Sequence, residues 1–274
     1  MMIQSPASQL NINSRKARHS RKAFTLIELF VVIGIIALLA SLLLPALAIA
    51  QKRAKVTQTQ LQVAAIAAAI SHYELEHSAY PISTNALAAS QKVPPENGGP
   101  EDFTFGGTFQ TPAGGTTTVG LSTLSYVTNN SELMGVLYDL ETFPNGTRTI
   151  NQGHVKNLQR IPYLHYPPGA TTNSPGLGPD GVLRDLWGTP FVITIDANSD
   201  QKARDSFYRR PAVSADPGLP HGGRNGLIPR SLPGGAVVYE ANTPVMVWSA
   251  GPDKMIEDGP ANQGANRDNI LSWK

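Results

Sequence analysis

The stretch that decides the fold is FTLIELFVVIGIIALLASLLLPALAIA, which runs from Phe24 to Ala50. As a helix these 27 residues would span about 40 Å, and the hydrocarbon core of a bilayer needs about 20 residues. Residues 1–23 carry five basic residues and no acid, whereas three basic residues follow the stretch within residues 52–55. The larger basic excess precedes the span, so the positive-inside rule predicts one transmembrane helix with its N-terminus in the cytoplasm.

The rest of the composition is that of a globular, loop-rich chain. Hydrophobic residues make up 41% and charged residues 15% of the 274 residues, and Gly 25 with Pro 22 predicts many loops. The absence of cysteine excludes disulfides, thiol catalysis, Cys-ligated metals and a lipoprotein anchor. Residues 24–274 hold 17 basic and 20 acidic residues, and this net charge of −3 gives no reason to expect a nucleic-acid partner.

An acidic residue inside the apolar stretch separates three interpretations of the N-terminus. A permanent signal anchor would account for an apolar segment, and so would a secretory signal peptide cut after the A-x-A-like site Ala48-Ile49-Ala50. Neither explains Glu28, because burying a lone carboxylate in lipid costs ~2.5–3.5 kcal/mol. In the third interpretation the chain is cut between Ala23 and Phe24, and the new α-amino group of Phe24 pairs with Glu28 of a neighbouring subunit. Head-to-tail repetition of that pair builds a filament that does not close.

The segment RKAFTLIE, residues 21–28, resembles the cleavage and methylation site of type IV prepilins and type II secretion pseudopilins. Counted from Phe24, Glu28 is the fifth residue and Pro45 the twenty-second, as in that family, and Ala23 stands where the family usually has Gly. The resemblance implies that prepilin peptidase cuts between Ala23 and Phe24 and N-methylates Phe24. It also implies that Glu28 directs assembly and that Pro45 interrupts the helix, as proline does by removing a hydrogen bond.

Beyond the span, the pattern predicts an amphipathic helix over residues 51–81. Apolar residues recur there at steps of three and four, and a Tyr-Pro pair at 80–81 ends the pattern. We expect an α+β fold of pilin-like "lollipop" form, in which the long helix packs on a small antiparallel β-sheet head with long loops, residues 82–274. Strands are predicted within 103–109, 191–195, 236–239 and 245–248, and a short helix over 131–140.

An acidic loop near the C-terminus is the second candidate site. Oxygen-bearing side chains occupy eight positions in residues 253–269, with little apolar content to hold the loop in shape. Ca²⁺ takes 6–8 oxygen ligands in flexible geometry, so it could organise such a loop. The spacing is not that of an EF-hand, and a solvated, turn-rich loop accounts for the residues equally well.

The segment 249–273 is similar to the C-terminus of major pseudopilins, where an acidic turn and an acidic pair before I-x-S-W bind one calcium ion. The resemblance implies calcium ligands at Asp253, Asp268 and Asn269, and Asp258 is a further candidate by proximity. Lys254 replaces the usual Gly, and Arg267 and Asn269 stand where acids often are.

The resemblance implies a structural subunit, not an enzyme, and no catalytic motif is present in the sequence. The expected function is polymerisation into a type II secretion pseudopilus for protein export across the outer membrane. The leader 1–23 would be removed, and residues 24–50 would form the transmembrane helix and filament core. The head would lie in the periplasm, anchored in the inner membrane before assembly.

Implied partners are further copies, minor pseudopilins, prepilin peptidase, the assembly platform and its ATPase, and membrane lipid. A type IV pilus subunit for adhesion, motility or DNA uptake, or a membrane-anchored periplasmic binding domain, remains as an alternative.

Overall fold

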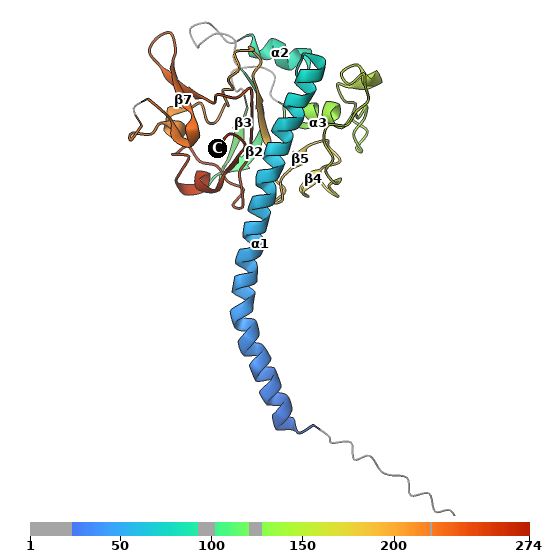
Figure 1. Ribbon diagram of the computed structural model, residues 1–274, viewed down its shortest axis with the longest axis vertical. Helices are drawn as coiled ribbons and strands as arrows, with labels where there is room; N and C mark the ends of the chain where they lie inside the picture. Colours follow the sequence, from blue (N-terminus) through green and yellow to red (C-terminus); the bar gives the residue numbers. More distant parts are fainter. Residues whose placement is uncertain (1–23, 93–101, 121–127, 220) are drawn as a thin grey trace, which may run out of the picture. The chain divides into compact units, whose positions relative to one another are not determined.

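The computed structural model describes residues 24–92, 102–120, 128–219 and 221–274 (Figure 1). It divides into two compact units, Met1–Ile49 and Ala50–Lys274, which are described one at a time. The second unit is called the body below. Ala23 and the rest of the basic leader lie outside the described residues, as do parts of the long middle region, 82–180.

In the first unit, the described residues form the beginning of helix α1 (Leu26–His77). The apolar side chains from Phe24 to Ile49 are exposed almost without exception. The expected interruption at Pro45 is wrong for this chain, because α1 continues through Pro45 although proline removes one backbone hydrogen bond. Among the described residues, α1 is the one helix that is long and apolar enough to cross a membrane, as judged by length and composition. Exposed leucine, isoleucine and valine on every side of a helix are stable in lipid or against other apolar helices, and not in water.

Within the body, α1 buries one face. Thr59, Val63, Ile66, Ile70 and Tyr73 are all buried, at steps of three and four. This stripe agrees with the pattern predicted from the sequence. The helix ends at His77, and Ser78 takes a left-handed conformation with φ +50°.

The body is built on a four-stranded antiparallel sheet in the order β1-β6-β9-β10. Its strands are β1 (Phe103–Phe105), β6 (Val192–Ile195), β9 (Val245–Ser249) and β10 (Ile270–Leu271). Side chains alternate between its faces, because successive residues of a strand point to opposite sides. Ile193 and Val247 join the apolar cluster that includes the buried stripe of α1, whereas Met246 and Trp248 join a second cluster with Phe207 and Tyr208.

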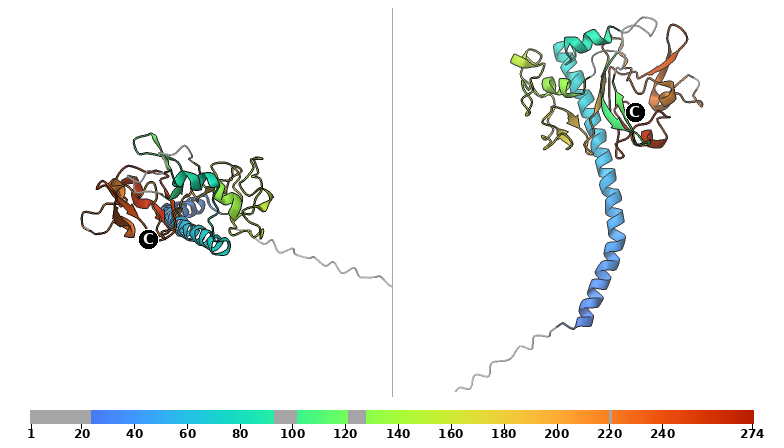
Figure 2. Two further views of the ribbon diagram at one scale, coloured as in Figure 1. Left: turned by 90° about the horizontal axis from the view of Figure 1, so that it is seen from above. Right: turned by 180° about the vertical axis from the view of Figure 1, so that it is seen from behind.

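Short elements surround this sheet. They are α2 (Thr84–Ser90), α3 (Ser131–Leu137), α4 (Pro211–Ser214), the 3₁₀ turns η2 (Gln152–His154), η3 (Arg224–Gly226) and η4 (Gly264–Asp268), and the strand pairs β2–β3 (Gly107–Gln110, Thr116–Val119), β4–β5 (Gly176–Leu177, Leu183–Arg184) and β7–β8 (Ile228–Ser231, Val237–Glu240). Figures 1 and 2 place β7 on one side of the body part of α1, and α3, β4 and β5 on the other.

The α+β class with a long N-terminal helix and antiparallel sheets is confirmed. The expectation of one strand over 103–109 is wrong, because β1 and β2 belong to different sheets and separate at Gly106. A side chain at Gly106 would place its Cβ 1.7 Å from the carbonyl oxygen of Val119, so the chain turns here only with glycine. The short helix predicted over 131–140 ends at Leu137, and Asp139 follows with φ +54°.

Candidate functional site

The first candidate site is the beginning of α1. Phe24 is exposed, and Thr25 caps the helix: the backbone N–H of Glu28 donates to Thr25 Oγ1 at 3.3 Å. In return Glu28 Oε2 accepts hydrogen bonds from the backbone N–H and the hydroxyl of Thr25, both at 2.8 Å. This reciprocal arrangement is a capping box.

Glu28 therefore has a partner inside its own helix, which the sequence analysis missed although Thr-x-x-Glu before an apolar run is its signature. Both bonds to Thr25 end on Oε2. A carboxylate has about four lone-pair sites, so Oε1 retains the capacity to accept from a further donor. The arrangement is compatible with a second, intermolecular partner for Glu28. It also shows that the carboxylate is not bare in a single chain.

The second candidate site lies where the acidic loop joins β9 to β10. Strand pairing places Ile270 opposite Ser249, so residues just after β9 and just before β10 are brought together. Gly251 packs against Asp268: a Cβ at Gly251, where φ is +72°, would lie 2.3 Å from the Asp268 carbonyl oxygen. Asn266 holds the loop closed by donating to the carbonyls of Glu257 and Gly259.

Two of the predicted ligands have buried oxygens without a hydrogen-bond partner among the described residues, Asp268 Oδ1 and Asn269 Oδ1. Asn269 Nδ2 donates to the hydroxyl of Tyr208 at 2.9 Å, which fixes the orientation of the amide. A buried oxygen without a donor is costly, since it has lost its water and gained nothing. Both atoms can therefore accept a hydrogen bond from a further donor or bind a cation.

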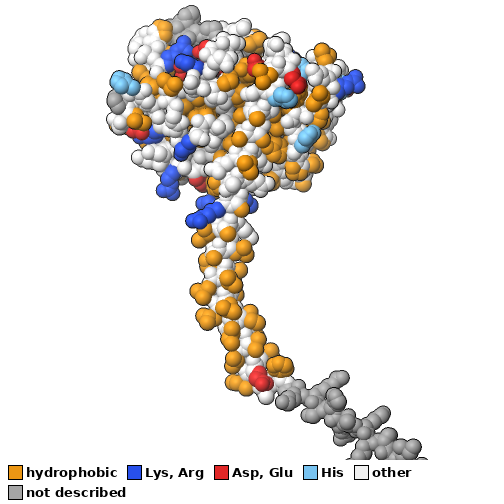
Figure 3. Space-filling model, viewed as in Figure 1, with side chains coloured by type: hydrophobic (Ala, Val, Ile, Leu, Met, Phe, Trp, Pro, Cys, Tyr) orange, Lys and Arg blue, Asp and Glu red, His pale blue; other side chains and the backbone are white. Residues whose placement is uncertain are grey.

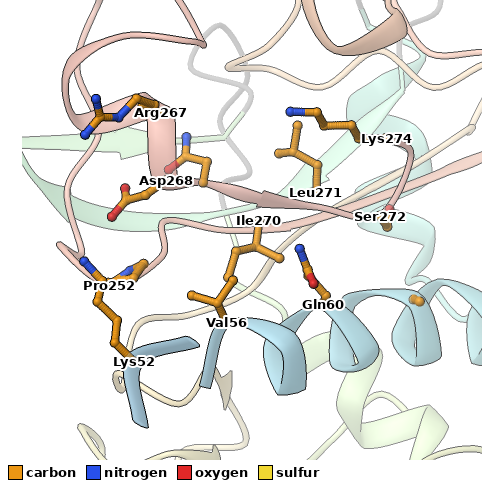
Figure 4. A pocket seen from close by; sticks show the side chains of 12 residues that line it. Lys52, Val56, Gln60, Pro252, Arg267, Asp268, Ile270, Leu271, Ser272 and Lys274 are labelled. Carbon is orange, nitrogen blue, oxygen red and sulfur yellow. The ribbon is translucent and has the colours of Figure 1, made fainter. Parts of the chain in front are cut away.

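Two carboxylates also lie close together at this place, and one ammonium offsets part of their charge. Burial raises the pKa of Asp268, the nearby charge of Asp253 raises it further, and the ammonium of Lys52 lowers it. Burial likewise raises the pKa of Asp253. A hydrogen bond from the Met255 N–H to its carboxylate and the charge of Lys52 lower that pKa in part. A groove of about 620 Å³ lies between the body part of α1 and the segment around β10. Figure 4 shows that Lys52 extends from α1 beside Pro252, on the side of this groove to which the Asp268 carboxylate points.

The structure does not bring Asp258 to these residues. Its side chain is 70% exposed and pairs with Arg210 at 2.9 Å. Within the described ranges no group of three or more His, Asp or Glu side chains is placed to hold a metal. The set at the loop is instead two carboxylates and an amide, and such oxygen donors fit a hard cation like Ca²⁺ better than a transition metal.

Residues 47–112 match the family model described as "Type II secretion system (T2SS), protein G". The chain is 38% identical over 86 residues to the type II secretion system core protein G of Pseudomonas aeruginosa, and 37% identical over 82 residues to that of Klebsiella michiganensis. The resemblance to type II secretion pseudopilins is confirmed.

The extent of these similarities is limited. They cover 31% and 29% of this chain, and the chain spans about three fifths of the relatives' length, 61% and 58%. The family match includes the body part of α1 and the strands β1 and β2, but neither Glu28 nor the acidic loop. No solved structure matches the chain.

Proposed function

We propose that this chain is a structural pseudopilin that polymerises through its N-terminal helix into a type II secretion pseudopilus, for protein export across the outer membrane. The proposal rests mainly on the match of residues 47–112 to the protein G family model. These residues follow the apolar beginning of α1, which has one acid in its first turn. A helix that is apolar on all sides can reside in lipid as a monomer and pack against copies of itself in a filament.

The proposal includes the processing of the N-terminus. Prepilin peptidase cuts between Ala23 and Phe24 and methylates the new α-amino group, and the charge on that nitrogen meets Glu28 of a neighbouring copy. Before assembly the helix anchors the chain in the inner membrane with the body in the periplasm. Minor pseudopilins, the assembly platform and its ATPase are the other partners, and the chain itself catalyses nothing.

Intact-mass and N-terminal peptide mass spectrometry test this proposal. The full chain is expressed with and without a prepilin peptidase and purified from membranes. The expected product is a chain that begins at Phe24 and carries one added methyl group, in the presence of the peptidase alone. A chain that keeps Met1, or begins at Gln51, under both conditions would contradict the proposal.

We further propose that the acidic loop binds one Ca²⁺ through Asp253, Asp268 and Asn269. Support comes from the two unpartnered oxygens and the adjacent carboxylates described above. Bound calcium would neutralise the carboxylates and tie together the two ends of the loop. Asp258 is not included, because it pairs with Arg210.

A further inference from the structure

An exposed apolar loop in the middle region has no role in the function proposed above. Val155, Leu158 and Ile161 are 63%, 75% and 45% exposed, and they lie within seven consecutive residues. We call residues 155–161 the apolar loop. Single exposed hydrophobics are common, but a group of three on one short loop is typical of an interaction surface.

The apolar loop is held in place by asparagines, not by apolar packing. Asn157 is fully buried, and its Nδ2 donates to the carbonyls of Val136 and Ile161 while its Oδ1 accepts from the Ile161 N–H. Asn151, also fully buried, accepts from the N–H groups of Lys156 and Asn157. These bonds fix the backbone with the three apolar side chains in solvent.

Aromatic residues then attach the apolar loop to the end of α1. The hydroxyl of Tyr73 donates to the Lys156 carbonyl at 2.6 Å. Tyr163, just after the loop, packs edge-on against Tyr73 at 5.4 Å, and its hydroxyl bonds with Glu76 and with His77 Nε2. Because this ordering is complete in the single chain, a partner that binds here loses little conformational entropy.

The opposite face of the same helix carries a complementary surface. Leu61 and Leu75, 69% and 77% exposed, are fourteen residues apart and so lie on one side of α1, away from the buried stripe. Residues 56–73 contain no Lys, Arg, Asp or Glu, and Figure 3 shows hydrophobic side chains gathered over the body part of α1. We call this the outer face of α1. It ends at Leu75 between two acids, Glu74 and Glu76.

The apolar loop has the opposite charge pattern. Its exposed Leu158 lies between Lys156 and Arg160, and residues 155–161 contain no acid. We propose that the apolar loop of one copy docks on the outer face of α1 of a second copy, with Leu158 against Leu75 and Arg160 beside Glu74. Different surfaces meet in this contact, so it can repeat from copy to copy, and it builds a helical array when the repeated rotation does not close a ring. The inference rests on the proposed function, because it assigns a contact between bodies in the filament.

Cysteine cross-linking tests the contact directly, since the natural chain has no cysteine. Two differently tagged full chains are co-expressed in membranes with the secretion machinery, one with Leu75→Cys and one with Leu158→Cys, and then oxidised. We expect mixed disulfide dimers at least fivefold above those from Leu75→Cys paired with Leu219→Cys, a leucine that is 52% exposed elsewhere. Equal yields from the two pairs would overturn the proposal.

A charge exchange provides the specificity control. Arg160→Glu should lower the cross-link at least threefold, and adding Glu74→Arg on the other chain should restore it. Loss without restoration would overturn the assigned pairing. The polymer yield of the unaltered chain is measured in parallel. If polymer forms without the cross-link, this contact alone is refuted. If the cross-link forms without polymer, the proposed function alone is refuted. If neither forms, both are refuted.

Discussion

The first turns of α1 and the acidic loop both hold carboxylates, and the two sites provide them with different partners. Glu28 is bonded within one helical turn, to Thr25 three residues before it. Asp268 depends on residues distant in the sequence: Asp253 adds charge, Lys52 offsets it, and Oδ1 has no hydrogen-bond partner among the described residues. The first carboxylate is partnered within its own helical turn, whereas the surroundings of the second are set by the fold and leave one of its oxygens without a hydrogen-bond partner among the described residues.

The largest effect is expected at Glu28. If its main task is to receive a neighbour's amine, Glu28→Gln should lower polymer yield at least tenfold, because the intermolecular ion pair is lost. Thr25→Val removes the cap but keeps the acid, and should cost helix stability of about 1 kcal/mol with little loss of polymer. Polymer is measured in sheared fractions, with N-terminal processing checked by mass spectrometry. Equal losses of polymer in the two variants would show that Glu28 acts only as part of the helix cap.

The second effect concerns the close approach that shapes the acidic loop. Gly251→Ala should destabilise the body by about 2–3 kcal/mol, because it adds a clash with Asp268 to an unfavourable positive φ. Gly114→Ala is the matched control: φ is +80° there, but nothing lies within 4 Å of the added Cβ, so it should cost only about 1 kcal/mol. Urea unfolding of the full chain in detergent measures both. A similar loss of unfolding free energy in the two variants would mean that the loop shifts to accommodate a Cβ at Gly251.

The third effect is that of calcium on thermal stability. Millimolar Ca²⁺ should raise the melting temperature of the full chain in detergent by a few degrees, as ligand binding to the native state does. Asp268→Ala should abolish the rise, and Asp258→Ala should leave it intact, since its surface ion pair with Arg210 contributes at most about 1 kcal/mol. Differential scanning calorimetry decides the matter, and a rise that survives Asp268→Ala would exclude the proposed ligand set.

The smallest effect is expected on the pH dependence of the free energy of unfolding. The folded state raises the pKa values of Asp253 and Asp268 above their ordinary values, so it binds protons more tightly than the unfolded chain. Without calcium, this part of the stability is greatest at low pH and declines as pH rises above about 4, by less than about 1.4 kcal/mol per pH unit and group. Asp268→Asn should flatten the decline between pH 4 and 6 in urea unfolding. An unchanged slope would show that these carboxylates are already compensated.

Much of the fold can be predicted from local patterns. The apolar stretch from Phe24 and the buried stripe of α1 are periodic over many turns, so they identify one helix. The strands at 192–195, 237–240 and 245–249 lie within one residue of their predicted bounds, because they are short β-branched runs between Pro/Gly-rich segments.

Other features depend on contacts between distant residues, which no local pattern encodes. The split at Gly106 depends on the carbonyl of Val119, and the orientation of Asn269 on Tyr208. His154 gave no sequence signal, yet it lies between Asp139 and Glu141, at 2.7 and 2.9 Å. The cap on Glu28 is a local feature, and the spacing of Thr25 and Glu28 before an apolar run predicts it.

That cap has an energetic consequence for any change of partner. A donor that approaches Glu28 from another molecule meets a carboxylate that already accepts two hydrogen bonds from Thr25. It is added to the Thr25 bonds or displaces them, so the driving force is only the difference between two satisfied states. In the assembly proposed above, a difference of this size would leave Glu28 with nearly the same free energy in the single chain and in the filament.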